Sequence, residues 1–187
     1  MCGLVQKLTK DCADGKLGEL WMKANIGNAL LPKGRQGLLD DALAGDFTHA
    51  LFIDDDMQFT LGAIDSLLSR DLDIVAVNGC KKKFPIEGSA TGLDGKHMDS
   101  AGKTGVEEAA FAGMGIMLMK LDAIRSVQKP HFEIIWHEPA GTYLGEDYYF
   151  AAKLRGAGIK LHVDHDASRM TRHVGGFGYT FPALKKE

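Results

Sequence analysis

The stretch LFIDDDMQFT, residues 51–60, places three consecutive aspartates directly behind an apolar run. That run, THALFI from residue 48, has the length and composition of a strand covered on both faces of a sheet. Ligands of open α/β sheets bind just beyond the carboxyl ends of the strands. Because carboxylates repel one another, Asp54, Asp55 and Asp56 are predicted to meet a positive charge there.

The nature of that charge follows from the geometry of an extended strand. If the strand continues through the acids, Asp54 and Asp56 lie on one side and Asp55 on the other. Two carboxylates on one side suit Mg²⁺ or Mn²⁺, usually together with substrate phosphates. The alternative is an acidic strand-to-helix turn, which one aspartate would satisfy as a helix cap. A calcium EF-hand does not fit, because Phe59 stands where its loop needs glycine.

Composition limits the other function classes. The chain has 187 residues and a net charge of −3, so no basic field indicates binding to nucleic acid or to an anionic membrane. Its three cysteines lack zinc-type spacing and indicate free thiols in a reducing compartment. No apolar stretch reaches the roughly 18 residues of a membrane span, and no signal peptide is visible. A cytoplasmic protein without a membrane span is expected.

The rest of the chain alternates helix and strand signals. Helices are expected at 1–10, 32–45, about 61–68 and 145–158, and strands at 18–26, 48–53, 72–79, 111–120, 131–136 and 159–164. The polar, glycine-rich residues 87–105 are expected to form a loop or hairpin. This alternation predicts a single α/β domain over residues 1–187 with a mostly parallel central sheet.

Two acids open the helix expected at 145–158. Asp147 falls on one helical stripe with Phe150, Ala151 and Leu154, so it is expected to look into a cleft at the mouth of the helix. Partial burial there would raise its pKa and make it a candidate general base. Glu146 lies off that stripe and is expected to be solvated. The alternative is that both acids only complement the helix macrodipole.

A third group lies near the end of the chain. The stretch HVDHDASRMTRHVGG, residues 162–176, carries three histidines and two aspartates, and imidazole is a common ligand for Mn²⁺. Taken singly, each histidine is more often structural. His173 is followed by Gly175 and Gly176, which allow the backbone to approach a ligand closely.

The order of these motifs, with "GMG" at 113–115 before an apolar strand and His-x-Gly near the end, resembles the GT-A-fold glycosyltransferases, especially the family 2-like bacterial and phage enzymes. The resemblance covers most of the chain from residue 32 to 179. It implies an enzyme that uses Mn²⁺ or Mg²⁺ and moves a sugar from a nucleoside diphosphate sugar, most readily a UDP-sugar. The acceptor would be the hydroxyl of a glycan or another molecule, attacked with inversion.

The resemblance also implies roles for the acids and the histidine. Asp54 resembles the acid that contacts the nucleotide ribose or the metal, and Asp56 resembles the direct metal ligand. His173 resembles the late metal ligand. Asp147 resembles the catalytic base, with Glu146 beside it.

Two further segments match the family pattern. Gly113, Met114 and Gly115 resemble the loop that shapes the acceptor and sugar pocket. KGRQ resembles an Arg-Asn step at the start of a helix, where Arg35 would contact the donor, although Gln36 replaces the usual asparagine.

One departure concerns the start of the chain. Family members open with a central strand beside the Asp-x-Asp strand, whereas MCGLVQKL has helical spacing, so an N-terminally shortened fold is expected. The sheet beside residues 51–53 should then be altered, either by GELWMKAN moving against it or by a second chain in a homodimer.

Two alternatives to a glycosyltransferase remain. The first is a non-catalytic remnant that binds a nucleotide sugar or a glycan. The second is a haloacid-dehalogenase-like phosphatase, which also carries Asp-x-Asp after a strand. That class has Thr two residues beyond the second aspartate, where this chain has Gln58.

Overall fold

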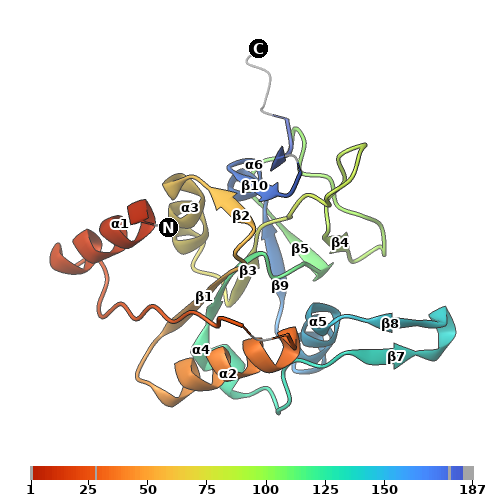
Figure 1. The fold of residues 1–187 in the computed structure, drawn as a ribbon, viewed down its shortest axis with the longest axis horizontal. Helices are drawn as coiled ribbons and strands as arrows, with labels where there is room; N and C mark the ends of the chain where they lie inside the picture. Colours follow the sequence, from red (N-terminus) through yellow and green to blue (C-terminus); the bar gives the residue numbers. More distant parts are fainter. Residues whose placement is uncertain (1, 28, 177, 183–187) are drawn as a thin grey trace.

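A six-stranded sheet organises the computed structural model, which describes residues 2–27, 29–176 and 178–182 (Figure 1). Its strands, in spatial order, are β1 (His49–Ile53), β6 (Ile116–Lys120), β3 (Ile74–Ala76), β9 (Leu161–Asp164), β5 (Val106–Phe111) and β4 (Thr91–Gly92). The predicted strands before the aspartates, at 72–79 and at 159–164, are therefore confirmed in the centre and at one edge of this sheet.

The prediction of a mostly parallel sheet is wrong. Among the strand pairs of the described residues, only β3 and β9 run parallel, and the other neighbours in this sheet pair antiparallel. The apolar runs correctly indicated strands that are covered on both faces. They did not indicate direction, because burial on two faces is equally compatible with an antiparallel neighbour such as β6.

Helices cover both faces of the sheet and make two separate cores. The helices are α1 (Cys2–Ala13), α2 (Leu31–Ala44), α3 (Leu61–Ser69), α4 (Leu121–Arg125), α5 (Glu146–Gly156) and α6 (His165–Arg169). Along β6, Met117 and Met119 pack into the core with α2, α4 and α5, whereas Ile116 and Leu118 pack into the core with α1, α3 and α6. This alternation is the two-residue period of a strand buried on both sides.

The segment before α2 departs from its prediction. Residues 18–26 form no strand, and Trp21, Met22 and Ile26 are exposed there, Trp21 with 67% of its surface. The Trp21 ring does contact Phe47, just before β1. The prediction of a strand here is wrong, because a strand needs a neighbouring strand to accept its backbone hydrogen bonds, and an apolar pattern alone does not supply one.

The start of the chain is helical, as its spacing predicts. Leu4 and Leu8 of α1 are buried against α3. Strand β1 lies at the edge of the sheet, with β6 on its inner side. Within the described residues no strand pairs with its outer side. The expectation that GELWMKAN fills this side is therefore wrong, because residues 18–26 form no strand there, and the homodimer stays a prediction.

Two smaller sheets complete the fold. One contains β2 (Met57–Phe59), β10 (Thr171–Val174) and β11 (Gly178–Tyr179). The other is a hairpin of β7 (Ile135–His137) and β8 (Thr142–Leu144), joined by η1 (Glu138–Ala140), so the strand predicted at 131–136 begins only at 135.

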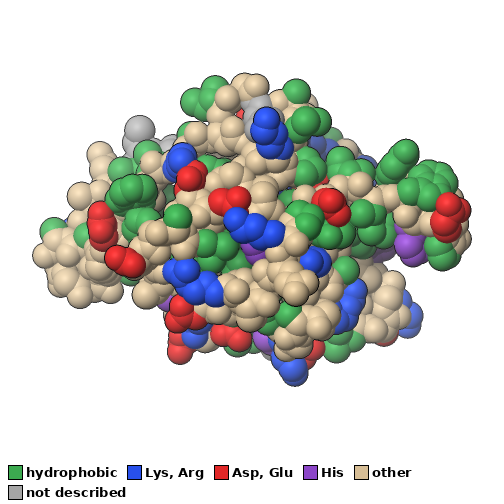
Figure 2. Space-filling view, turned by 90° about the horizontal axis from the view of Figure 1, so that it is seen from below, with side chains coloured by type: hydrophobic (Ala, Val, Ile, Leu, Met, Phe, Trp, Pro, Cys, Tyr) green, Lys and Arg blue, Asp and Glu red, His purple; other side chains and the backbone are tan. Residues whose placement is uncertain are grey.

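The hairpin projects from the body of the molecule (Figure 1). Hydrophobic side chains gather at that end of the molecule (Figure 2), and Ile134, Trp136 and Tyr143 are exposed there. No helix in the described part of the chain combines the length and the apolar character that a membrane crossing requires.

Candidate functional site

The three aspartates lie in a tight turn between β1 and β2. Strand β1 ends at Ile53, and the N–H of Met57 donates to the carbonyl oxygen of Asp54 at 3.2 Å. The chain turns here because β2 pairs with β10 in a different sheet. The expectation that Asp54 and Asp56 share one side of an extended strand is therefore wrong, and each acid has its own partners.

Arg35 joins the end of β1 to the start of α5. Its guanidinium donates from Nη2 to both carboxylate oxygens of Asp54 at 3.0 Å, and from Nη1 to Oε1 of Glu146 at 2.5 Å. Arg35 is 5% exposed and lies near the start of α2, whose first turn contains Pro32. A residue predicted to contact a donor molecule is thus placed to fix two acids.

The two acids at the start of α5 differ from their prediction in one respect. Glu146 was expected to be solvated, but it is 8% exposed because it pairs with the buried Arg35. Asp147 is half-buried. Burial and then the neighbouring Glu146 carboxylate raise the pKa of Asp147, against the smaller effects of the Tyr148 N–H and Arg35. Asp147 thus has the environment expected of a general base, and its role stays a prediction.

The glycines of "GMG" lie against these acids. A Cβ on Gly113 would lie 3.4 Å from Oγ of Ser89 and 3.8 Å from Oδ2 of Asp147. The carbonyl oxygen of Gly115 accepts the N–H of Asp54 at 2.9 Å. The loop that the resemblance assigned to the sugar pocket therefore lies beside both the aspartate turn and the start of α5.

Asp56 and His173 meet where β2 pairs with β10. Oδ2 of Asp56 lies 3.0 Å from Nε2 of His173 and accepts from Nζ of Lys82 at 2.7 Å. On the other side of the ring, Nδ1 of His173 lies 2.9 Å from the carbonyl oxygen of Cys80. Burial alone would raise the pKa of Asp56, but the hydrogen bonds from Lys82 and His173 outweigh it and lower that pKa.

Lys82 is the residue of this site that sequence reasoning missed. It lies in CKKKF, just after β3, and a run of lysines is usually a solvated surface. The available signal was its position beyond the carboxyl end of a buried strand, the same signal that identified the aspartates.

The expected metal-ligand set is only partly assembled. Asp56 and His173 meet, but Asp54 is held by Arg35 instead. Across residues 2–27, 29–176 and 178–182, no group of three or more His, Cys, Asp and Glu side chains is arranged to hold a metal ion. His165, from the same stretch as His173, is buried elsewhere, between Ser100 and Glu107.

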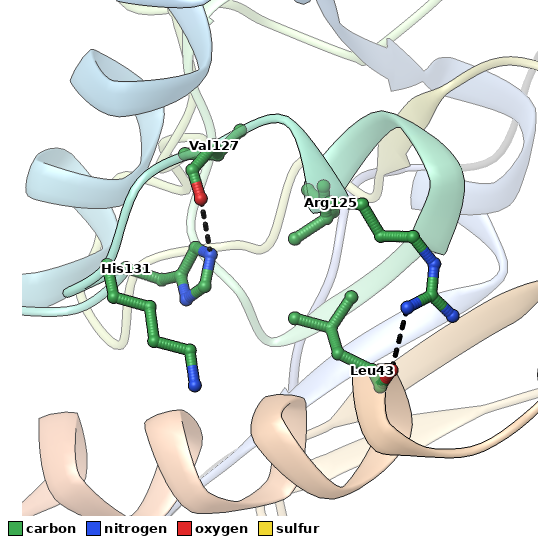
Figure 3. Close-up of a pocket in the computed structure, with 6 residues that line it drawn as sticks. Leu43, Arg125, Val127 and His131 are labelled. Carbon is green, nitrogen blue, oxygen red and sulfur yellow. Dashed lines mark hydrogen bonds between the residues drawn. The ribbon is translucent and has the colours of Figure 1, made fainter.

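A hollow of about 410 Å³ lies away from these residues, between the end of α2 and α4 (Figure 3). Arg125 donates there to the carbonyl of Leu43 at 2.7 Å, and Nε2 of His131 donates to the carbonyl of Val127 at 3.2 Å. Burial lowers the pKa of His131. Because no predicted site residue lines this hollow, the aspartate turn remains the candidate site.

Comparison with known proteins supports the fold alone. No protein-family model and no curated protein matches the chain. Among solved structures, it is similar to one described as the crystal structure of A197 from STIV. The TM-score is 0.51 at 16% sequence identity, over 83% of this chain and 73% of that one. This likeness shows a shared α/β arrangement.

Proposed function

We propose that this chain is a metal-dependent glycosyltransferase with a GT-A-like fold. It moves a sugar from a nucleoside diphosphate sugar, most readily a UDP-sugar, to the hydroxyl of a glycan or another acceptor, with inversion at the anomeric carbon. The observation that carries this proposal is the way in which the His173 imidazole is held against Asp56.

The hydrogen bond on the far side of the ring fixes the tautomer of His173. The Cys80 carbonyl oxygen can only accept, so Nδ1 carries the ring proton. At Nε2, which lies 3.0 Å from the Asp56 carboxylate, an imidazolium would donate its second N–H to Asp56, whereas a neutral ring would present a lone pair to it. Two lone pairs at this distance repel each other unless a proton or a cation lies between them. Metal-binding histidines characteristically donate their other N–H to a carbonyl or carboxylate.

In this proposal the ion is Mn²⁺ or Mg²⁺, for which the Asp56 carboxylate is the preferred type of ligand. One carboxylate oxygen and one imidazole nitrogen converge, and such ions often take few protein ligands, with substrate phosphates and water completing the shell. Asp56 and His173 would hold the ion. When bound, it would stabilise the charge that develops on the diphosphate leaving group.

Arg35 has a positioning role in this proposal. Its buried guanidinium fixes the Asp54 carboxylate at the end of β1 and Glu146 at the start of α5. Asp54 keeps part of its carboxylate exposed. It is therefore available to accept hydrogen bonds from the donor ribose, while Arg35 itself is enclosed.

Asp147 would act as the base. The acceptor oxygen forms a bond to the anomeric carbon as the bond from that carbon to the diphosphate oxygen breaks. The hydroxyl proton passes to the Asp147 carboxylate, and the diphosphate leaves with the electron pair. The raised pKa of Asp147 favours this proton transfer.

The test combines donor turnover with ligand-induced stabilisation. UDP- and GDP-sugars are incubated with the protein, with Mn²⁺ and with EDTA, and release of free nucleoside diphosphate is measured. Mn²⁺ with UDP should also stabilise the fold, by about 2.7 kcal/mol at 100-fold the Kd. Asp56→Ala and His173→Ala should abolish the part of the turnover and of the stabilisation that depends on Mn²⁺.

Three results would contradict the proposal. Unchanged Mn²⁺ affinity in both Asp56→Ala and His173→Ala would remove the metal site. Stabilisation without turnover would instead identify a non-catalytic binding protein. Phosphate release from simple phosphoesters without a nucleotide would identify a phosphatase.

A further inference from the structure

The three lysines after β3 divide between two sides of the chain. Nζ of Lys81 lies 2.6 Å from Oε1 of Glu87, and Lys83 also pairs with Glu87. These two lysines lower the pKa of Glu87 to about 2. Lys82, between them, points the other way and pairs with Asp56 at 2.7 Å. Two of the three lysines thus share the single Glu87 carboxylate, and the third is directed at Asp56 in the candidate site.

The Lys82 ammonium is bound to the same oxygen that faces His173. Oδ2 of Asp56 is 2.7 Å from Nζ of Lys82 and 3.0 Å from Nε2 of His173. The Lys82 stem lies along Gly175, where an added Cβ would be 3.3 Å from Cδ of Lys82. The short run from Cys80 to Lys82 therefore supplies both the carbonyl that orients His173 and the cation that binds Asp56.

The ammonium and a divalent ion would compete for this oxygen. A carboxylate oxygen that accepts a short bond from an ammonium offers less of its charge to a metal, and two cations in contact with it repel each other. The Lys82 side chain is partly exposed, and its ammonium group lies at the end of a flexible stem. The ammonium can therefore leave Asp56 without disrupting a core. The nearest new partner for it would be an anion bound at the same metal.

We propose that Lys82 is an internal cation that competes with the metal for Asp56 when no donor is bound and transfers to the diphosphate when metal and nucleotide enter. This inference rests on the proposed function, because it concerns the same metal and the same donor. Lys82 then weakens the binding of the metal when no nucleotide is present and strengthens the binding of the nucleotide.

The test compares Lys82→Met with Lys81→Met. Both variants remove one positive charge and keep a long stem, but Lys81 lies on the Glu87 side and serves as the matched control. Affinity for Mn²⁺ alone is measured by electron paramagnetic resonance, and affinity for UDP at saturating Mn²⁺ by calorimetry. Lys82→Met should bind Mn²⁺ about tenfold more tightly and UDP about tenfold more weakly, the scale of one hydrogen bond to a charged group. Lys81→Met should change neither value appreciably.

The two affinities must move in opposite directions. If Mn²⁺ binds the wild-type protein but Lys82→Met changes both affinities in the same direction, or neither, the Lys82 inference is overturned and the proposed metal site stands. Equal effects in Lys81→Met would show that the change in net charge alone explains the result, which would also overturn the Lys82 inference. If Mn²⁺ binds none of the three proteins, the metal site and the inference both fail.

Discussion

Two arginine-centred acidic clusters, one around Arg70 and one around Arg35, differ in what completes their carboxylates. In the first, Asp164 is fully buried and accepts from Arg70, from the hydroxyl of Ser66 and from two backbone N–H groups at the start of α6. Ser66 lies in α3, Arg70 directly follows that helix, and the two N–H groups belong to α6, so helices hold all of these donors in place. Such a carboxylate has little acceptor capacity left for a ligand.

The cluster around Arg35 and the acids next to it leave more carboxylate capacity open. Asp54, which Arg35 holds, is partly exposed. Asp56, two residues further on, is also partly exposed and is held by Lys82 and His173 instead of an arginine. Asp147 is half-buried, and its pKa is raised rather than lowered. An arginine between two acids therefore does not by itself identify a functional site. The distinguishing feature is whether fixed donors of the fold already satisfy the carboxylates.

The largest expected effect is on stability at Asp164. Asp164→Ala removes the cap of α6 and the buried partner of Arg70, which keeps only Asp166, so it should lower the free energy of unfolding by about 2–4 kcal/mol. Asp56→Ala should lower it by less than about 1 kcal/mol, because that pair is partly exposed. Urea denaturation measures the free energy of unfolding of both variants, and equal losses would contradict the distinction between Asp164 and Asp56.

The next effect is on turnover at Asp147. Asp147→Asn should lower sugar transfer by roughly 10²-fold or more, the scale of general-base loss. It should not lower the melting temperature, because it removes a carboxylate whose ionised form is disfavoured by burial and by Glu146. Glu146→Gln is the control and should destabilise the protein by weakening the pair with Arg35. Normal transfer in Asp147→Asn with loss in Glu146→Gln would show that the base is the other neighbour.

The smallest effect is a pair of opposite pH dependences. The folded pKa of Asp147 lies above its ordinary 3.8, so its contribution to stability is full below that value and is lost as pH rises through the folded pKa. Asp147→Asn should therefore gain stability relative to wild type as pH rises.

Asp164 has the reverse sign. Burial would raise its pKa, but the hydrogen bonds from Arg70, Ser66 and the Ala167 N–H outweigh burial and lower it. Its contribution is present above 3.8 and is lost as pH falls through the folded pKa. The deficit of Asp164→Asn should therefore shrink at acid pH. Thermal unfolding from about pH 3 to 7 tests both signs, and parallel slopes would contradict the assignment.

The sequence predicted the elements of this fold better than their arrangement. Apolar runs located β1, β3 and β9, and a proline start with a glycine stop located α2. These signals are local, so they could be read without the fold. Strand direction, the absence of a strand at 18–26 and the start of β7 depend on partners elsewhere in the chain, which a local pattern does not contain.

The site shows the same division. The expected acids and His173 lie close to strand or helix ends, where the sequence pattern placed them. The partnership of Arg35 with Glu146 joins residues 111 positions apart, so the burial of Glu146 was not visible in its own helix. Lys82 was missed because its two neighbours are ordinary surface lysines, and only the fold separates it from them.

The two edges of the central sheet give the molecule an unequal capacity for association. One edge, β4, has two residues and a shift in register, so it is a poor template for another strand. The other edge, β1, has five residues with apolar side chains at 50–53, and its outer side lacks a paired strand among the described residues. Pairing of two copies through β1 would consume the one full-length edge of each. Each copy would then have no second edge of this kind to offer, so association would stop at a closed dimer and could not propagate into a filament.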